Sequence, residues 1–143
     1  MKENWKTNWR RSTRGIKMAQ LDDTIPSNAF LDTINNTKIT RQASSLLSQL
    51  RIGHIPLNSY LYKFKLVNSS RCPACGAAVE SIHHFLLTCP NYSYERWPLI
   101  QKTGRTPTLK DLLVNPKLTK HPPNYTEANG RFKHEGEFVK PDQ

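Results

Sequence analysis

The sequence predicts a mainly α-helical fold, and three observations support this prediction. Apolar residues recur with helical period through the middle of the chain, no stretch alternates between apolar and polar residues as a half-buried strand does, and three cysteines gather beside a histidine within 18 residues. A chain of 143 residues with 36% hydrophobic residues and ten prolines can bury one modest core. We therefore expect a small helical domain that a metal-binding knuckle staples together, with irregular N- and C-terminal segments.

The first expected segment, residues 1–25, is basic and contains two tryptophans. Its first twenty residues carry six Lys or Arg residues and one acidic residue. This composition suits nucleic-acid binding, because cations contact phosphates while aromatic rings stack on unpaired bases. Trp5 and Trp9 also lie four residues apart, on one face of a helix, where they could dock on the domain instead. The pattern leaves both interpretations open.

The helical domain should span residues 26–115 and begin with a short helix between Pro26 and Asn35. The strongest element follows it. Apolar residues there occupy positions i, i+4, i+7, i+8 and i+11, namely Ile39, Ala43, Leu46, Leu47 and Leu50. Gly53 is placed to end this helix in the left-handed conformation. The polar face of the same helix includes Arg41 and Arg51.

A second helix should follow a turn at residues 54–56, because apolar residues recur at i, i+3, i+4 and i+7: Leu57, Tyr60, Leu61 and Phe64. Further along, a helix running from Tyr92 towards Ile100 is interrupted by Pro98, and Thr108 can cap another short helix. Beyond residue 115 the apolar period fades and two adjacent prolines would break a helix. We expect residues 116–143 to form an irregular or disordered tail.

The knuckle, residues 72–89, contains the strongest chemical signal in the chain. Cys72, Cys75, His84 and Cys89 form the pattern Cys-x2-Cys-x8-His-x4-Cys, and no cysteine lies outside it. Zn²⁺ prefers four nitrogen or sulfur ligands in a closed tetrahedron, which this set supplies. Ser81 can cap a short helix through the histidine, and Pro90 stops it. We predict a structural Zn²⁺ site.

Other readings of these residues explain less. A Cys-Pro-Ala-Cys sequence can be a redox pair, but the preceding residues are loop-like and a redox role leaves Cys89 unexplained. A disulfide framework would leave one of the three cysteines unpaired. His83 lies beside His84 at an equally permitted spacing from Cys89, so spacing alone does not decide which histidine is the ligand.

Four phrases in order give the chain a family resemblance. They are Leu-Arg-Ile-Gly-His at 50–54, Leu-Asn-Ser-Tyr-Leu at 57–61, Cys-Pro-Ala-Cys-Gly at 72–76 and Glu-Ser-Ile-His-His-Phe-Leu-Leu-Thr-Cys-Pro at 80–90. Together they resemble the C-terminal zinc-binding (CCHC, reverse-transcriptase-associated) region of non-LTR, LINE-type retrotransposon polyproteins, most closely those of fungal elements. The resemblance covers about residues 38–100, and more loosely residues 5–30 and the phrase Asn129-Gly130-Arg131-Phe132. In it, His84 matches the family's ligand and His83 a variable position.

The resemblance implies a fragment that lacks the polymerase and RNase H domains of the parent polyprotein. The acidic residues of the chain are consistent with the lack of these two domains. There are eleven of them, and they are scattered and form no carboxylate pair suited to two divalent metals. We therefore expect no enzymatic activity. Without a hydrophobic leader or membrane-spanning segment, the chain should be intracellular, in the nucleus or cytoplasm, not secreted and with no membrane partner.

The net charge of +10 is concentrated in the first half, where residues 1–71 hold twelve Lys or Arg residues against four Asp or Glu. RNA or DNA is accordingly the expected partner. The candidate contact residues are Arg10, Arg11, Arg14, Arg41, Arg51, Lys63, Lys65 and Arg71. The alternative is a structural module that packs on a neighbouring reverse transcriptase or RNase H domain. A contiguous basic patch would favour the first function, and scattered cations the second.

Overall fold

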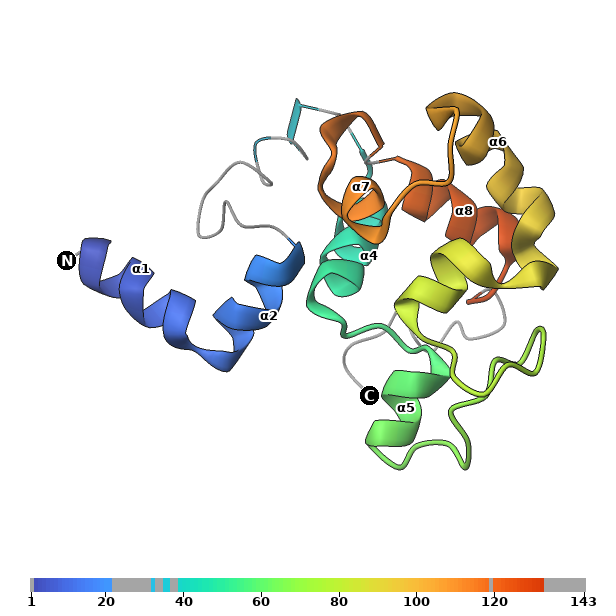
Figure 1. Ribbon diagram of the computed structural model, residues 1–143, viewed down its shortest axis with the longest axis horizontal. Helices are drawn as coiled ribbons and strands as arrows, with labels where there is room; N and C mark the ends of the chain where they lie inside the picture. The colour runs from blue at the N-terminus through green and yellow to red at the C-terminus, as the bar shows by residue number, and fades with distance from the viewer. Residues whose placement is uncertain (1, 22–31, 33–34, 37–38, 119, 133–143) are drawn as a thin grey trace.

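The computed structural model confirms the mainly α-helical fold (Figure 1). It describes residues 2–21, 32, 35–36, 39–118 and 120–132, and contains no strand within these ranges. The α-helices are α1 (Lys2–Arg11), α2 (Thr13–Leu21), α4 (Arg41–Ile52), α5 (Asn58–Lys63), α6 (Ser93–Thr103), α7 (Leu109–Val114) and α8 (His121–Asn129). A π-helical turn occupies His84–Thr88, and 3₁₀ turns occupy Pro90–Tyr92 and Pro116–Leu118. Most of the short helix predicted from Pro26 lies outside the described residues.

The predicted central helix is α4, and both of its ends fall at the expected signals. Thr40 caps the N-terminus, because its Oγ1 accepts a hydrogen bond from the Ala43 N–H at 3.1 Å. Gly53 ends the helix with φ at 77°, a conformation that glycine adopts without strain. The apolar stripe faces inward, since Leu47 and Leu50 are each 1% exposed. Helix α4 also contacts α2, α7 and α8, so it is the central helix of the domain.

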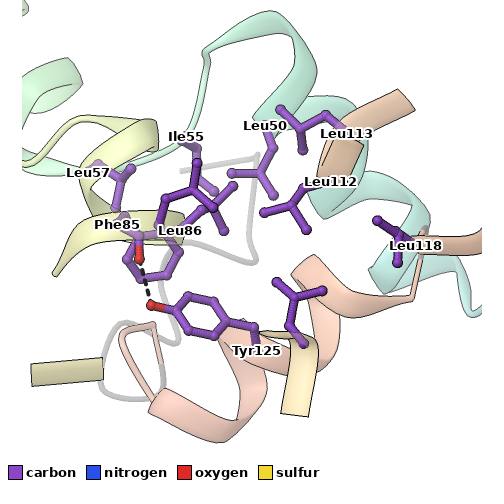
Figure 2. Packing of buried hydrophobic residues seen from close by; sticks show 11 residues of the cluster. Leu50, Ile55, Leu57, Phe85, Leu86, Leu112, Leu113, Leu118 and Tyr125 are labelled. Atoms are coloured by element: carbon purple, nitrogen blue, oxygen red, sulfur yellow. Dashed lines mark hydrogen bonds between the residues drawn. The ribbon is translucent and has the colours of Figure 1, made fainter. Parts of the chain in front are cut away.

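The hydrophobic core joins α4 to the knuckle and to the C-terminal helices (Figure 2). Phe85, from the knuckle, is completely buried, and its ring meets those of Tyr125 and Phe132 at centroid distances of 5.4 and 5.9 Å. The buried members are Leu50, Ile55, Leu57, Phe85, Leu86, Leu87, Leu99, Leu112, Leu113, Leu118 and Tyr125. Each side chain of this size contributes about 1.5–3 kcal/mol when fully buried. The knuckle therefore shares its core with helices that follow it in the chain.

The two predicted short helices around the knuckle form, with differences in detail. At α5, the N-cap Leu57 and the helical residue Leu61 are buried, but Phe64 lies just beyond the helix end and is 54% exposed. Thr108 caps the N-terminus of helix α7, as the sequence predicted, and its side chain forms a capping box with that of Asp111. Helix α6, by contrast, continues through Pro98 without interruption.

The prediction of an irregular tail from residue 116 is wrong for residues 121–129, which form α8. Pro122 and Pro123 lie in the first turn of that helix, where the backbone N–H groups have no intrahelical acceptor and proline costs nothing. Tyr125 and Leu118 are each 6% exposed and belong to the core. The packed domain therefore extends beyond residue 115 to Phe132, which also contacts the core.

The prediction of an irregular lead segment is also wrong, because α1 and α2 cover residues 2–21. Gly15 permits the sharp corner between them, since a Cβ atom there would lie 1.8 Å from the Trp9 carbonyl oxygen. Helix α2 reaches α4 and α7, whereas Figure 1 shows α1 extending away from the other helices. Trp5 stacks on Trp9 at 6.3 Å and is 58% exposed, so this ring is not docked on the domain.

A buried ion pair ties the C-terminal end of the domain to the knuckle. The Arg131 guanidinium donates to both carboxylate oxygens of Glu80, at 2.8 and 3.0 Å, and Glu80 is completely buried. The same carboxylate accepts a hydrogen bond from the Asn58 N–H at 2.7 Å, at the start of α5. One buried acid thus joins three segments that are distant in sequence. Two-pronged Arg–carboxylate geometry is among the strongest arrangements of charged side chains.

We expect Arg131→Met to lower the free energy of unfolding by about 3–5 kcal/mol, because it leaves the Glu80 carboxylate buried without its cation. Urea unfolding of the zinc-loaded protein measures this loss. Arg105→Met is the matched control, since its pair with Asp111 is exposed and surface pairs contribute only about 0–1 kcal/mol. Equal, small losses in both variants would contradict a stabilising role for the buried pair.

Candidate metal centre

Cys72 and Cys75 lie on a tight turn that points both thiols to one side. The Gly76 N–H donates to the Cys72 carbonyl at 2.9 Å, and the Cys72 N–H donates to the Ala77 carbonyl at the same distance. Gly76 has a φ of 77°, which favours glycine after the second cysteine. No helix begins at Cys72, so the backbone does not offer the setting of a redox pair.

His84 and Cys89 come from the second half of the knuckle, where the helix changes its hydrogen-bond register. Ser81 caps the helix as predicted, since its Oγ accepts from the His84 N–H at 3.1 Å. The Cys89 N–H then donates to the His84 carbonyl at 2.8 Å, an i to i+5 bond that makes the turn π-helical. In an α-helix, side chains five residues apart point about 140° apart. The wider turn instead closes at Cys89 and lets both ligands face the same point.

The two halves bring four donor atoms together. The Sγ atoms of Cys72, Cys75 and Cys89 and a ring nitrogen of His84 all lie within 4.8 Å of one another. Cys72 Sγ and Cys89 Sγ are 3.8 Å apart, and Cys75 Sγ lies 3.3 Å from His84 Nε2. Tetrahedral Zn²⁺ with ordinary bond lengths requires about 3.8 Å between two sulfurs and about 3.5 Å between sulfur and nitrogen. The arrangement therefore fits a structural zinc ion with four protein ligands.

The structure separates the two histidines that spacing could not. His83 is exposed and lies outside the cluster, whereas His84 directs Nε2 towards the thiols. The other ring nitrogen, Nδ1, lies 3.2 Å from Thr88 Oγ1. A metal on Nε2 requires a proton on Nδ1, which then donates to the Thr88 hydroxyl oxygen. Thr88 fixes the ring and its tautomer, a role that the sequence did not reveal.

The surroundings of the thiols shift their pKa values in opposite directions. A backbone hydrogen bond from Ala77 lowers the pKa of the Cys75 thiol, whereas burial raises the pKa of the Cys89 thiol to about 11. A buried thiol of this kind becomes a thiolate when a cation sits beside it. Zinc binding must therefore release the Cys89 proton at neutral pH.

Two side chains from outside the knuckle hold the π-helical turn in place. Arg96 on α6 is only 6% exposed, and it donates to the Leu86 carbonyl at 3.0 Å and to the Cys89 carbonyl at 2.8 Å. The Tyr125 hydroxyl donates to the Phe85 carbonyl at 2.5 Å (Figure 2), and burial raises the pKa of this tyrosine to about 12. These bonds satisfy carbonyls that a regular helix would pair internally. Sequence reasoning missed both residues, because Tyr125 lies 36 positions beyond Cys89 and no periodic pattern marks Arg96, seven positions beyond Cys89, as buried.

Seven of the eight basic residues predicted to contact nucleic acid are exposed: Arg10, Arg11, Arg14, Arg41, Lys63, Lys65 and Arg71. The prediction for Arg51 is wrong. Its side chain is 7% exposed and donates to the Leu113 carbonyl in α7 at 2.7 Å. Helical period placed this residue on the polar face of α4, but α7 packs there and supplies a buried acceptor.

The exposed cations lie in three places. Arg10, Arg11 and Arg14 belong to α1 and α2, whereas Lys63, Lys65 and Arg71 lie around α5 and the start of the knuckle. Arg41 lies at the start of α4, whose 12 residues span about 18 Å. About one helix length therefore separates Arg41 from the cations Lys63, Lys65 and Arg71, whose surface is called the α5 end below. The predicted set therefore does not form a single patch. By the criterion set above the set as a whole favours packing on a neighbouring domain, and only the smaller group of Lys63, Lys65 and Arg71 favours nucleic-acid contact.

A comparison with known protein families supports the zinc site described above. Residues 13–97, more than half of the chain, match the model of the family described as zinc-binding in reverse transcriptase. The chain belongs to this family. The match contains the four clustered ligands and Arg96, but it ends before α7, α8 and Arg131. No curated protein and no solved structure matches the chain.

Membership of the zinc-binding family supports zinc as the ion that the Cys72, Cys75, His84 and Cys89 cluster holds. A four-ligand tetrahedral site stabilises the fold and has no open position for a reacting water molecule. Among the described helices, none is long and apolar enough to cross a lipid bilayer.

We expect His84→Ala to abolish tight zinc binding, while His83→Ala retains it, because only His84 directs a ring nitrogen into the cluster. Competition with a chromogenic zinc chelator measures both affinities. A structural zinc site contributes on the order of 10 kcal/mol of apparent binding free energy, so His84→Ala should also lose helical circular dichroism. Equal effects in the two variants would refute the assignment.

Thr88→Val should weaken zinc binding by about tenfold, because it removes the acceptor that orients the His84 ring while keeping the side-chain volume. The same chelator competition reports the change. Thr103→Val serves as the control, since its hydroxyl bonds only to carbonyls near the end of α6. An unchanged affinity in Thr88→Val would show that packing alone orients the histidine.

Proposed function

We propose that this chain is a non-catalytic, zinc-stabilised module of a retroelement protein that binds RNA or DNA. The observation that carries the proposal is a long stretch of the sequence that contains no acidic residue. Residues 33–79 contain no Asp or Glu, although they include six Lys or Arg residues. Three of these cations, Lys63, Lys65 and Arg71, are exposed around α5.

The next acidic residue along the chain does not neutralise this surface. Glu80 is completely buried and its carboxylate is paired with Arg131, so it presents no negative charge to solvent. Exposed cations whose neighbours in the sequence carry no negative charge attract the phosphates of nucleic acids. A second group on α1 and α2, with Arg10, Arg11 and Arg14 exposed, adds to the attraction. We infer that the α5 end is the principal contact and α1 an auxiliary one.

The absence of a catalytic arrangement supports a binding role. Within the described ranges, the zinc cluster is the one group of three or more His, Cys, Asp or Glu side chains close enough to hold a metal ion. Nucleic-acid polymerisation and hydrolysis commonly require carboxylates around two divalent metals. Thiolates that are bound to zinc in a closed site are poor nucleophiles. We therefore propose that the module itself catalyses no reaction.

A specific observation also favours a second function, packing against a neighbouring reverse transcriptase or RNase H domain of a parent polyprotein. Tyr94 and Trp97 lie three residues apart on α6 and are 87% and 57% exposed. Adjacent exposed aromatic residues are typical of protein interfaces. In this alternative, zinc stabilises the domain and the cations serve solubility.

The family phrases further support an origin in a non-LTR element of LINE type, most similar to fungal elements. The three cysteines are free thiols, as zinc binding requires, and thiols persist in reducing compartments. We accordingly propose an intracellular location, in the nucleus or the cytoplasm, where element RNA and target DNA are found.

If three cations at the α5 end contact phosphates, the log–log slope of affinity against salt should be about −2 for single strands, at about 0.7 per phosphate. Neutralising Lys63, Lys65 and Arg71 together to Gln should remove about two units of this slope and leave only the contribution of the auxiliary cations on α1 and α2. Fluorescence anisotropy of a labelled oligonucleotide measures this slope at several salt concentrations.

The matched control neutralises Lys102, Lys110 and Lys117, which are also exposed but lie on α6, on α7 and in a 3₁₀ turn. It makes the same change in net charge and should retain most of the slope. Absence of binding by the unaltered chain at low salt would reject nucleic-acid binding and favour the packing function.

A further inference from the structure

Three aromatic rings form a ladder on the surface at the α5 end. The His54 and Tyr60 rings lie 5.5 Å apart between centroids, and the Tyr60 and Phe64 rings lie 4.8 Å apart. Tyr60 and Phe64 meet because they are four positions apart, Tyr60 within α5 and Phe64 at its C-cap, whereas His54 comes from the turn after α4. Tyr60 is partly buried between its neighbours, while His54 and Phe64 are exposed. The ladder therefore holds two exposed rings in fixed positions.

The residue after this ladder has an unusual backbone conformation. Lys65 has a φ of 58°, and among the described non-glycine residues it alone has a positive φ. The Lys65 N–H donates to the Tyr62 carbonyl at 3.0 Å and the Leu66 N–H donates to the Leu61 carbonyl at 2.9 Å. These two bonds define the Schellman ending of a helix, in which the left-handed position is usually glycine.

The other left-handed helix ends follow that rule. Helices α4, α6 and α8 end at Gly53, Gly104 and Gly130, with φ between 67° and 77°. At α5 the chain places lysine in a conformation that a side chain disfavours. Folding alone would favour glycine at this position, so the lysine points to a role outside folding.

The charges around the ladder suit a polyanion. Lys63 and Lys65 flank Phe64 and are exposed, and within the described residues neither takes part in an ion pair. The acid-free stretch of residues 33–79 includes all three rings and both lysines. The arrangement combines exposed aromatic rings with exposed cations on neighbouring residues, which is the combination that binds unpaired nucleotides.

We propose that His54, Tyr60, Phe64, Lys63 and Lys65 form a binding surface for single-stranded nucleic acid. Unpaired bases stack on the exposed faces of Phe64 and His54, and the two lysines contact the adjacent phosphates. A duplex keeps its bases stacked inside, so it offers the rings no face and meets only the lysines. This inference rests on the proposed nucleic-acid binding and assigns it a site, a mode and a preference for unpaired strands.

Two substitutions separate this role from a structural one. Lys65→Gly relieves the backbone conformation, so the midpoint of urea unfolding should stay or rise while affinity for single strands falls several-fold. Phe64→Leu retains an apolar side chain but removes the ring, and should weaken binding by about fivefold or more, the loss of one stacked base. Trp97→Leu is the matched control, because Trp97 on α6 has nearly the same exposure, 57% against 54%, and should bind normally.

The probes are labelled oligothymidylate, oligouridylate and a DNA duplex, titrated against the zinc-loaded 143-residue chain. An oligonucleotide that contains one 2-aminopurine adds a direct readout, since its fluorescence falls when the base stacks on a ring. We expect tighter binding of single strands than of duplex, and quenching that Phe64→Leu abolishes.

The outcomes distinguish the site from the function. If the unaltered chain binds single strands and both α5 variants bind equally well, the site is refuted while nucleic-acid binding stands. If the unaltered chain binds no probe, both fail. If Phe64→Leu instead disrupts binding to a purified reverse transcriptase domain and leaves oligonucleotide binding intact, the ladder is a protein interface and the inference is overturned.

Discussion

The structure depends on the meeting of three thiols and one imidazole at a single point. Two segments with different backbones supply these groups, a glycine-dependent turn for Cys72 and Cys75 and a π-helical turn for His84 and Cys89. No strand pairing joins the two segments. Besides the hydrogen bond that the Asn91 side chain donates to the Ala74 carbonyl, the metal ligands hold the two segments together. Thiolates repel one another within 4.8 Å unless a cation lies between them. Zinc therefore compensates the charge and fixes the relative position of the two halves at once.

The metal does not act alone, because the residues behind the π-helical turn come from the C-terminal part of the domain. Arg96 and Tyr125 occupy the carbonyls of the turn, and Arg131 secures the knuckle through Glu80. Tyr125 and Arg131 lie beyond the residues that match the zinc-binding family. Metal binding and docking of the C-terminal helices thus stabilise the same backbone, so loss of either one should weaken the other.

The features that the sequence predicted correctly depend on interactions between residues that are close together in the chain. The period of α4, its caps at Thr40 and Gly53, and the spacing of the ligands all depend on residues within a few positions of each other. The sequence does not indicate helix α8, because two adjacent prolines break a helix interior, whereas the first turn of a helix accommodates them. The ion pair between Glu80 and Arg131 joins residues 51 positions apart, and no periodic pattern in the sequence indicates such a contact.

Contacts between residues that are far apart in the sequence also explain why the net charge is a poor guide to the surface charge of this protein. Three arginines point inward: Arg51 and Arg96 donate to backbone carbonyls, and Arg131 is paired with the buried Glu80. The planar guanidinium suits this use, because its several donors satisfy more than one acceptor in a confined space. Lysine lacks that geometry and stays hydrated, as at Lys63 and Lys65 beside the aromatic ladder. The outward cations are therefore fewer than the composition suggests, and their position beside exposed rings, more than their number, determines what the surface can bind.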